Sequence, residues 1–259
     1  MALEVIVEAD GPILTITLNR PRSRNAINLE VCKGVADAIA WLESDPKLRV
    51  GILTGAGTVF CAGADLREAD LDGALAINNF EPGGFAGLVR AQRRKPLIGA
   101  AQGSALAGGF EILLACELVV AAESASFGLP EVGIGIMAAA GGVIALARQL
   151  PFPQAMKLLL TGEPIGASEA FRLGLITEVA AVDKVMERAR SLAMAIASAA
   201  PRSVECTLHL ARLTRAGAAD GVLQTVNDDL IQILLAEPDS AEGRRAFFEK
   251  RKPQWSGNS

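Results

Sequence analysis

The middle of the chain alternates short apolar runs with stretches of helical spacing, and this order limits the possible folds most. "VGILTG" (50–55) is a continuous apolar run ending in glycine, typical of a strand buried on both faces. "PLIGAAQG" (96–103) and "ELVVAA" (117–122) also favour strands. "GGFEILLAC" (108–116) and "GGVIALARQL" (141–150) favour helices. The alternation predicts right-handed crossovers and a mainly parallel α/β sheet.

The two ends of the chain complete this architecture. Strand patterns occupy 4–8 and 13–18, and a helix follows for which Asn28 is a suitable N-cap. Its expected apolar face is formed by Leu29, Val35, Ile39 and Leu42. From Pro151 onward the sequence predicts an almost wholly helical chain, with stop signals at Gly162, Gly174, Pro201, Gly217 and Pro238. We therefore expect an α/β core over 1–200 and a helical region over 201–259.

Composition excludes several classes of function. The 259 residues are 51% apolar and 21% charged with a net charge of −4, which indicates a soluble globular protein and argues against a nucleic-acid partner. "MALEVIVEAD" lacks the basic region of a secretory signal, so we expect a cytoplasmic location. The uncharged stretch 132–147 is too short to span a membrane and predicts a buried loop followed by a helix start.

The supply of reactive side chains narrows the chemistry further. His209 is the single histidine, so a histidine-rich metal site is impossible and no metal is expected. "QGSALAG" around Ser104 lacks the glycine spacing of a nucleophile elbow, which argues against a serine hydrolase. Phe60 interrupts a dinucleotide fingerprint in "TGAGTVFCAG". The four cysteines lie far apart, so we expect reduced and mostly buried thiols.

Two loops of small residues, "FCAGADL" (60–66) and "SALAGGFE" (104–111), each follow a predicted strand and precede a predicted helix. Glycine is costly to order, so a run of it indicates that something approaches the backbone closely. Tight packing of helix on strand would explain one such loop. Two loops of this kind favour an oxyanion hole, in which two backbone N–H groups face one point beside the positive end of a helix.

These residues resemble a known family. "FCAGADL", "GSALAGGFEILLACELVVAAESASFGLPEVGIG" and "AFFEKRKPQW" are similar to the enoyl-CoA hydratase/isomerase, or crotonase, family over essentially the whole chain. The hydratases and the carnitinyl-CoA dehydratase-like members are the most similar. The resemblance implies a crotonase-like (ClpP/crotonase) spiral core of ββα units with a helical C-terminal extension that covers the ligand or a neighbouring subunit. It also implies homotrimers or homohexamers, and no cofactor apart from the coenzyme A of the substrate.

The resemblance also implies residue roles. The N–H groups of Ala64 and Gly108 would hold the thioester oxygen, while Glu111 and Glu131 would act together as the acid and the base. The expected reaction is hydration of a 2-enoyl-CoA to a 3-hydroxyacyl-CoA, in fatty-acid β-oxidation or related acyl-CoA metabolism. Glu117 and Glu123, which flank a strand, are interpreted as ordinary solvated or sheet-end charges.

Contacts to coenzyme A follow from the same resemblance. Asp65 is expected to shape its loop and to cap a short helix at 65–70. The predicted coenzyme A and substrate contacts are Arg22, Arg24, Ala62, Gly63, Asp65, Leu66, Phe247 and Lys250.

The sequence departs from the family after Glu131, where many members carry a Pro-Gly pair. Here Met137, Ala138 and Ala139 precede the next glycines, so the acyl pocket that these residues are expected to line could accept a different acyl group. The alternatives are an enoyl-CoA isomerase, a carnitinyl-CoA dehydratase-like lyase, or an acyl-CoA binding protein without turnover. Retention of Glu111 argues against the isomerase.

Overall fold

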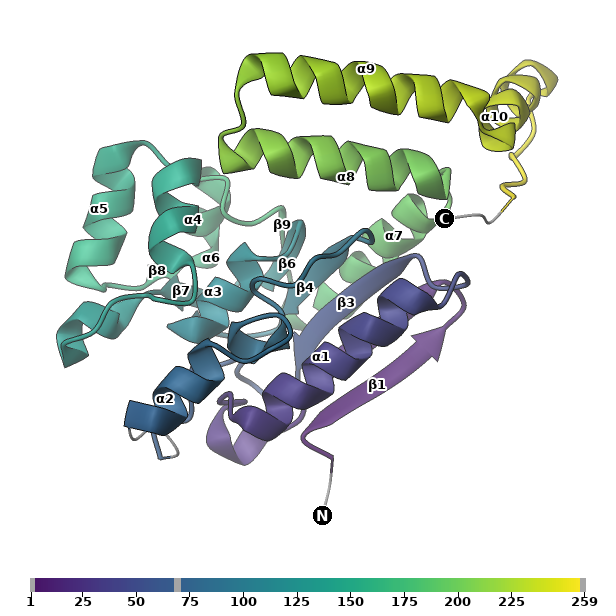
Figure 1. The fold of residues 1–259 in the computed structure, drawn as a ribbon. Coiled ribbons are helices and arrows are strands. Elements are labelled where there is room, and N and C mark those ends of the chain that lie inside the picture. The colour runs from purple at the N-terminus through teal and green to yellow at the C-terminus, as the bar shows by residue number, and fades with distance from the viewer. Residues whose placement is uncertain (1–2, 68–70, 257–259) are drawn as a thin grey trace.

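The computed structural model describes residues 3–67 and 71–256, and in this part of the chain a six-stranded sheet forms the centre (Figure 1). The strands, in spatial order, are β1 (Val5–Asp10), β2 (Ile13–Leu18), β3 (Val50–Gly55), β4 (Leu97–Ala101), β6 (Leu118–Ala122) and β9 (Glu178–Ala180). β1 pairs with β2 in antiparallel fashion and all other neighbours are parallel. The predicted mainly parallel α/β sheet is confirmed.

A smaller sheet in the described chain joins β5 (Ala105–Leu106), β7 (Ser126–Gly128) and β8 (Ile165–Gly166). β5 follows β4 directly and begins the second small-residue loop, so this sheet fixes the backbone just before that loop turns into a helix. The prediction of an almost wholly helical chain after Pro151 is confirmed, and the exceptions are the two residues of β8 and the three residues of β9. Both strands are too short to give an alternating pattern that sequence periodicity could detect.

Helix α1 (Leu29–Ser44) lies in front of the main sheet in Figure 1, and α7 (Val185–Ala197) lies behind it. The Asn28 side chain accepts a hydrogen bond from the Val31 N–H at 3.0 Å, which confirms the predicted N-cap. Val35, Ile39 and Leu42 are buried as expected, but Leu29 is exposed.

The remaining helices form the periphery. They are α2 (Leu71–Asn78), α3 (Gly108–Leu114), α4 (Gly142–Gln149), α5 (Phe152–Thr161), α6 (Ala167–Arg172), α8 (Pro201–Ala216), α9 (Asp220–Ala236) and α10 (Pro238–Glu249). Gly162 and Gly217 end helices in the left-handed conformation, and Pro201 and Pro238 begin helices, as the stop signals predicted. Residues 132–137 are exposed instead of forming the expected buried loop, although the expected helix start follows at Gly142.

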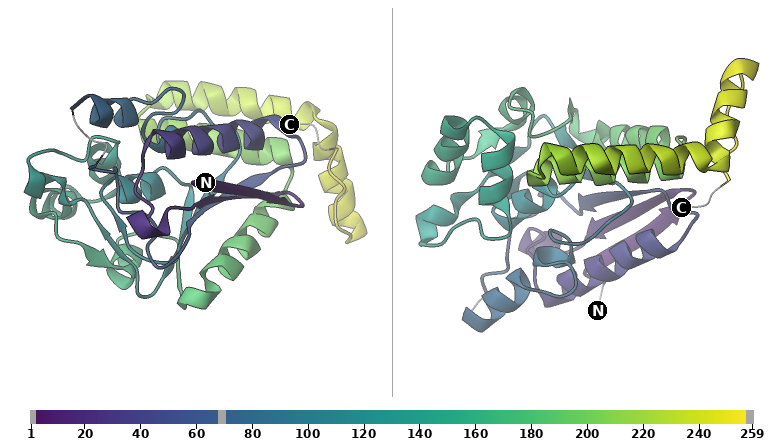
Figure 2. Two further views of the ribbon diagram at one scale, coloured as in Figure 1. Left: turned by 90° about the horizontal axis from the view of Figure 1, so that it is seen from below. Right: turned by 45° about the horizontal axis from the view of Figure 1, so that its top comes forward.

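The C-terminal helices α8 and α9 lie antiparallel above the core, and α10 projects from the far end of α9 (Figure 2). α8 begins at the expected boundary, but a separate unit over 201–259 stays a prediction. All four cysteines are free and buried, as expected. Among the described residues, no helix is both long enough and apolar enough to cross a membrane.

Candidate active site

The two small-residue loops are hydrogen-bonded to each other. The Phe60 N–H donates to the Ser104 carbonyl at 3.0 Å, and the Leu106 N–H donates to the Cys61 carbonyl at 3.0 Å. A Cβ on Gly109 would lie 2.2 Å from the Cys61 oxygen. The two loops can therefore make this contact only because residue 109 has no side chain. Their close packing explains why this position is a glycine.

The first loop is also fixed to the segment that precedes α1. The Ile27 N–H donates to the Gly63 carbonyl and the Asp65 N–H donates to the Ile27 carbonyl, both at 2.8 Å. The Ala62 N–H donates to the Arg24 carbonyl at 3.0 Å. Among the described residues, the Ala64 N–H donates to no protein acceptor. An immobilised backbone thus leaves this one amide available to a ligand.

The second loop turns into α3 through a strained residue. Ala107 has φ 51° and ψ −130°, a conformation that residues with a Cβ rarely adopt, and its N–H donates to the Gly128 carbonyl at 2.9 Å. Gly108 follows as the first residue of α3, and its N–H has no acceptor within the described chain. A Cβ on Gly63 would lie 3.2 Å from the Gly108 nitrogen. The amides of Ala64 and Gly108 therefore belong to backbone segments in close contact.

Asp65 anchors the first loop through its carboxylate. It forms ion pairs with Arg20 at 3.0 Å and with Arg67 at 3.1 Å. The hydrogen bond from the Arg67 side chain contributes most to holding the Asp65 pKa down, to about 2. The expected helix at 65–70 is wrong for the residues described, because Leu66 and Arg67 form a turn in which Asp65 accepts from the nearby Arg67 N–H. Residues 68–70 lie outside the described residues.

Glu111 lies inside α3 with its carboxyl group buried. Its side chain is 4% exposed, and Oε1 accepts a hydrogen bond from the Gly142 N–H at 2.7 Å. Burial raises the pKa of Glu111 to about 7; the Gly142 N–H opposes this shift, and the nearby charge of Glu131 adds to it. A Cβ on Gly142 would lie 3.0 Å from Glu111 Cγ, so the start of α4 packs directly on this side chain.

Glu131 reaches the same region from a 3₁₀ turn over Pro130–Ile134. It is 6% exposed, and its Oε2 has no hydrogen-bond partner among the described residues. Burial raises the Glu131 pKa. The negative charge of Glu131 also adds to the rise of the Glu111 pKa, so the two carboxyls lie in the same part of the molecule. The structure therefore brings together the two glutamates that the sequence separates by a helix and a strand.

A cavity of about 810 Å³ extends from Glu111 between α3, α4 and α8. Ala139, Ala140 and Gly141 line it on the side of α4. Ala138 is buried beneath this wall, and Met137 projects into solvent. Of the three residues expected to line the acyl pocket, Ala139 is the one that lines this cavity.

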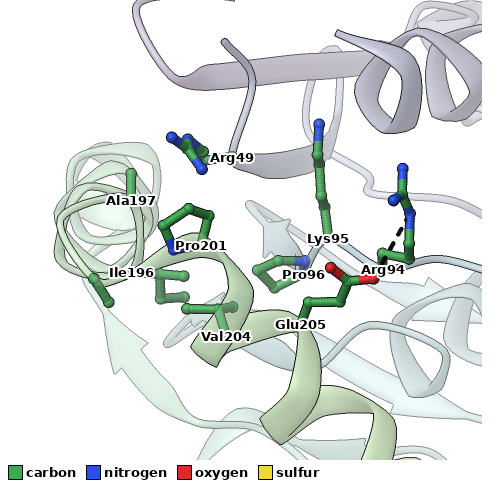
Figure 3. Close-up of a pocket in the computed structure, with 10 residues that line it drawn as sticks. Arg49, Arg94, Lys95, Pro96, Ile196, Ala197, Pro201, Val204 and Glu205 are labelled. Atoms are coloured by element: carbon green, nitrogen blue, oxygen red, sulfur yellow. Dashed lines mark ion pairs between the residues drawn. The ribbon is translucent and has the colours of Figure 1, made fainter. Parts of the chain in front are cut away.

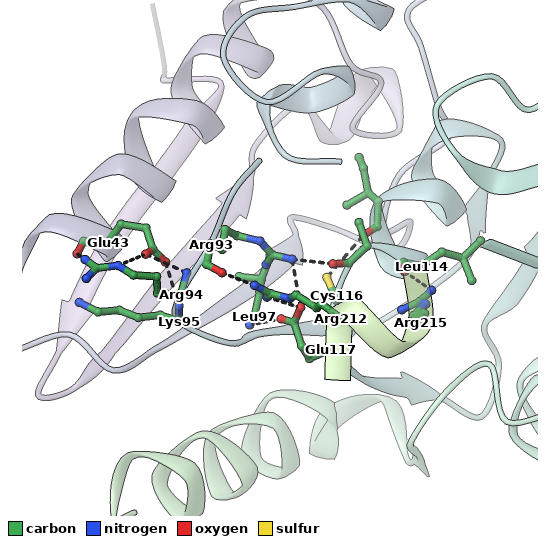
Figure 4. A network of polar contacts seen from close by, with 12 residues as sticks. Glu43, Arg93, Arg94, Lys95, Leu97, Leu114, Cys116, Glu117, Arg212 and Arg215 are labelled. Atoms are coloured by element: carbon green, nitrogen blue, oxygen red, sulfur yellow. Dashed lines mark hydrogen bonds and ion pairs between the residues drawn. The ribbon is translucent and has the colours of Figure 1, made fainter. Parts of the chain in front are cut away.

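Sequence reasoning missed the network at the other end of this cavity (Figure 4). The Glu117 carboxylate accepts hydrogen bonds from Arg93 and Arg212 and from the N–H of Leu97, the first residue of β4. Glu117 is therefore a sheet-end charge, as one of the two interpretations has it, but it is ion-paired and not an ordinary solvated charge. Arg212 lies 95 residues further along the chain, and no spacing rule connects such positions. Glu123 is exposed, as expected.

A second cavity, of about 20 Å³, lies between α8 and the segment at 94–96 (Figure 3). Lys95, Pro96 and Pro201 are among its lining residues. A cavity of this size holds about one water molecule, which excludes it as an acyl-thioester site.

The expected coenzyme A contacts fall into two groups. Arg22, Arg24 and Leu66 are exposed near the first loop, where Ala62 and Gly63 form the backbone. Phe247 lies in α10 and Lys250 ends that helix, at the far end of α9 from α4 (Figure 1). Within one chain, these two residues are therefore away from the paired glutamates.

The fold is of the crotonase type. The structure resembles the crystal structure of an enoyl-CoA hydratase from Mycobacterium tuberculosis H37Rv with a TM-score of 0.92 and 38% identity, covering 99% of this chain and 100% of that one. The mevalonyl-coenzyme A hydratase of Aspergillus fumigatus is 40% identical over 94% of this chain and 91% of its own length. The carnitinyl-CoA dehydratase of Salmonella typhi is 38% identical over 96% of each chain. The family model for enoyl-CoA hydratase/isomerase matches residues 8–258, and the chain belongs to this family.

Proposed function

We propose that this protein is a hydro-lyase that adds water reversibly across the double bond of a 2-enoyl-CoA. The observation that carries the proposal is the pair of buried carboxyls, Glu111 and Glu131. Glu131 Oε2 has no hydrogen-bond partner among the residues that the structure describes. A buried carboxylate oxygen is costly to leave unpaired, and a reacting water would supply the missing hydrogen bond. Family membership supports the same reaction.

The proposed chemistry follows the movement of charge. The water oxygen attacks the β-carbon, one carboxylate takes the released proton, and electrons move through the double bond to the thioester oxygen. The N–H groups of Ala64 and Gly108 would stabilise this enolate, with about 3 kcal/mol of transition-state energy for each donor. The second carboxyl, which is protonated because its pKa is raised, delivers a proton to the α-carbon. The product is the 3-hydroxyacyl-CoA.

The test is hydration of crotonyl-CoA, followed as loss of the enoyl-thioester absorbance. We expect Glu111→Gln and Glu131→Gln each to lower kcat by roughly 10²- to 10⁴-fold, because each removes a proton-transfer group. Glu123→Gln is the matched control, since Glu123 is exposed in the turn between β6 and β7, and it should retain full activity. Undiminished turnover in both active-site variants would refute the assignment. Hydration in water enriched in ¹⁸O distinguishes this reaction from isomerisation, because an isomerase incorporates no oxygen.

We also propose that the chain functions as a homotrimer or a pair of trimers. Within the described residues, α9 buries none of its side chains, and Phe247 and Phe248 of α10 are 77% and 80% exposed. Such apolar surface is typical of a subunit interface. In this arrangement Phe247 and Lys250 would meet the coenzyme A bound to a neighbouring copy, while Arg22, Arg24 and Leu66 would meet it within the same chain. A cytoplasmic location and a role in β-oxidation stay predictions.

A further inference from the structure

The lining of the large cavity carries an excess of positive charge. In the described chain the cavity is lined by six arginines but by three glutamates, one of which is Glu111 itself. The arginines are Arg90, Arg93, Arg94, Arg148, Arg212 and Arg215. Of the other two glutamates, Glu205 is paired with Arg202 at 2.7 Å and with Arg94 of the lining at 3.9 Å. An acyl group that reaches these arginines therefore meets a cationic surface.

Arg93 is the most strongly buried of these arginines, with 5% of its side chain exposed. Its Nη2 donates to the Ala115 carbonyl at 2.6 Å and to Glu117 at 3.3 Å. Nε and Nη1 of Arg93 are buried and have no hydrogen-bond partner among the described residues. Buried guanidinium donors without acceptors are unfavourable, so this position is suited to an anionic or strongly accepting ligand atom.

The acidic partner of Arg93 is shared. Glu117 Oε1 also accepts from Arg212 Nη2 at 2.6 Å, so one carboxylate faces two guanidinium groups. Arg212 additionally donates to the Arg93 carbonyl. Arg215 donates to the Leu114 carbonyl at 3.3 Å, which carries no charge. Arg93 and Arg212 together carry two positive charges, and Glu117 supplies one negative charge. These three side chains therefore keep one positive charge in excess.

Arg93 is within reach of an acyl group held at Glu111. Ala115, whose carbonyl accepts from Arg93, follows Glu111 by four residues, and four helical residues rise about 6 Å. A substrate whose β-carbon lies beside Glu111 would therefore extend toward Arg93 with three or four further carbons.

We propose that the acyl group of the natural substrate ends in a carboxylate, which Arg93 and Arg212 bind, so that the substrate is the coenzyme A monothioester of an unsaturated dicarboxylic acid. This inference rests on the proposed function and names the substrate class of the same site. A terminal trimethylammonium group is disfavoured, because it would face the same guanidinium groups at close range. A terminal methyl group would leave the Arg93 donors unpaired.

The first experiment measures binding by calorimetry with two saturated thioesters of equal length, hexanoyl-CoA and the monothioester of hexanedioic acid. We expect the carboxylate ligand to bind at least tenfold more tightly at low salt, and this ratio to fall as salt is raised. Arg93→Gln should reduce the ratio to about one. Arg188→Gln is the control and should leave the ratio unchanged. Arg188 is exposed in α7 and pairs with Glu178 of β9.

Equal affinities for the two thioesters in the unaltered protein, or tighter binding of hexanoyl-CoA, would overturn the inference without any variant. The second experiment compares hydration of 2-hexenoyl-CoA with that of the 2-hexenedioic monothioester, for which kcat/KM should be at least tenfold higher. Preferred binding of the dicarboxylic ligand with no hydration of either thioester would overturn the proposed function but not the anionic subsite. Hydration of both thioesters at equal kcat/KM would overturn the subsite but not the function.

Discussion

Glu111 has a buried carboxyl that accepts a hydrogen bond from the Gly142 N–H, and its pKa of about 7 makes the stability of the fold depend on pH. Because the folded-state pKa is raised from 4.5, the stability that this group contributes is full below pH 4.5 and is lost as pH rises toward 7. Glu111→Gln should therefore raise the free energy of unfolding by roughly 2 to 3 kcal/mol more at pH 8 than at pH 5. Urea denaturation at the two pH values measures this difference. A pH-independent effect would contradict the raised pKa.

Ala107 holds Gly108 in place at an energetic cost. Its conformation is one that glycine adopts more readily, so Ala107→Gly should raise the free energy of unfolding by about 1 kcal/mol. The same change should lower hydration activity, because the Gly108 amide loses its fixed orientation. The control is Ala195→Gly on the exposed side of α7, which should lower the free energy of unfolding by about 1 kcal/mol. Loss of stability in both variants would show that Ala107 is not strained.

Helix α3 and the first loop tolerate no added side chain where they contact each other. Gly109→Ala would bring a Cβ to 2.2 Å from the Cys61 carbonyl oxygen, which is backbone and cannot rotate away. We expect a loss of at least about 2 kcal/mol of stability together with most of the activity. Gly221, also the second residue of its helix, has open space around it, so Gly221→Ala should be neutral or stabilising by up to about 1 kcal/mol. Thermal unfolding of the two variants measures the contrast.

Elements with a strong local pattern were predictable. The N-cap at Asn28, the buried strand at 50–55 and the glycine and proline stops all depend on residues within a few positions of one another, and each appears in the structure. β8 and β9 escaped detection because they have two and three residues. The exposure of residues 132–137 was also missed, since an uncharged run does not tell which face is covered.

The candidate site was predictable where it depends on backbone. Two loops of small residues indicated close approach, and the structure shows them in contact. What the sequence could not indicate are partners that only the folded chain brings together. Gly142 as the donor to Glu111 and Arg212 as the partner of Glu117 are such cases, because they depend on how α4 and α8 pack.

Helices α9 and α10 leave apolar side chains exposed to solvent. We expect sedimentation to give a mass of about three or six times 26.9 kDa. Ile231→Asp should shift the protein toward smaller species, because a charge would be buried at the interface formed by α9. The control is Val182→Asp, at an exposed apolar residue outside these helices, which should keep the mass of the unaltered protein. A monomer in the unaltered protein would rule out the proposed assembly.

The order in which the chain is made sets when its acid chemistry can arise. The Glu111 carboxyl accepts its hydrogen bond from the N–H of Gly142, 31 residues later, and the Ala107 N–H donates to the carbonyl of Gly128. The ribosome therefore adds both residues to the chain before it adds their partners. A nascent chain stopped short of residue 142 lacks the Gly142 donor to that carboxyl, so this hydrogen bond forms only after more than half of the chain has been made.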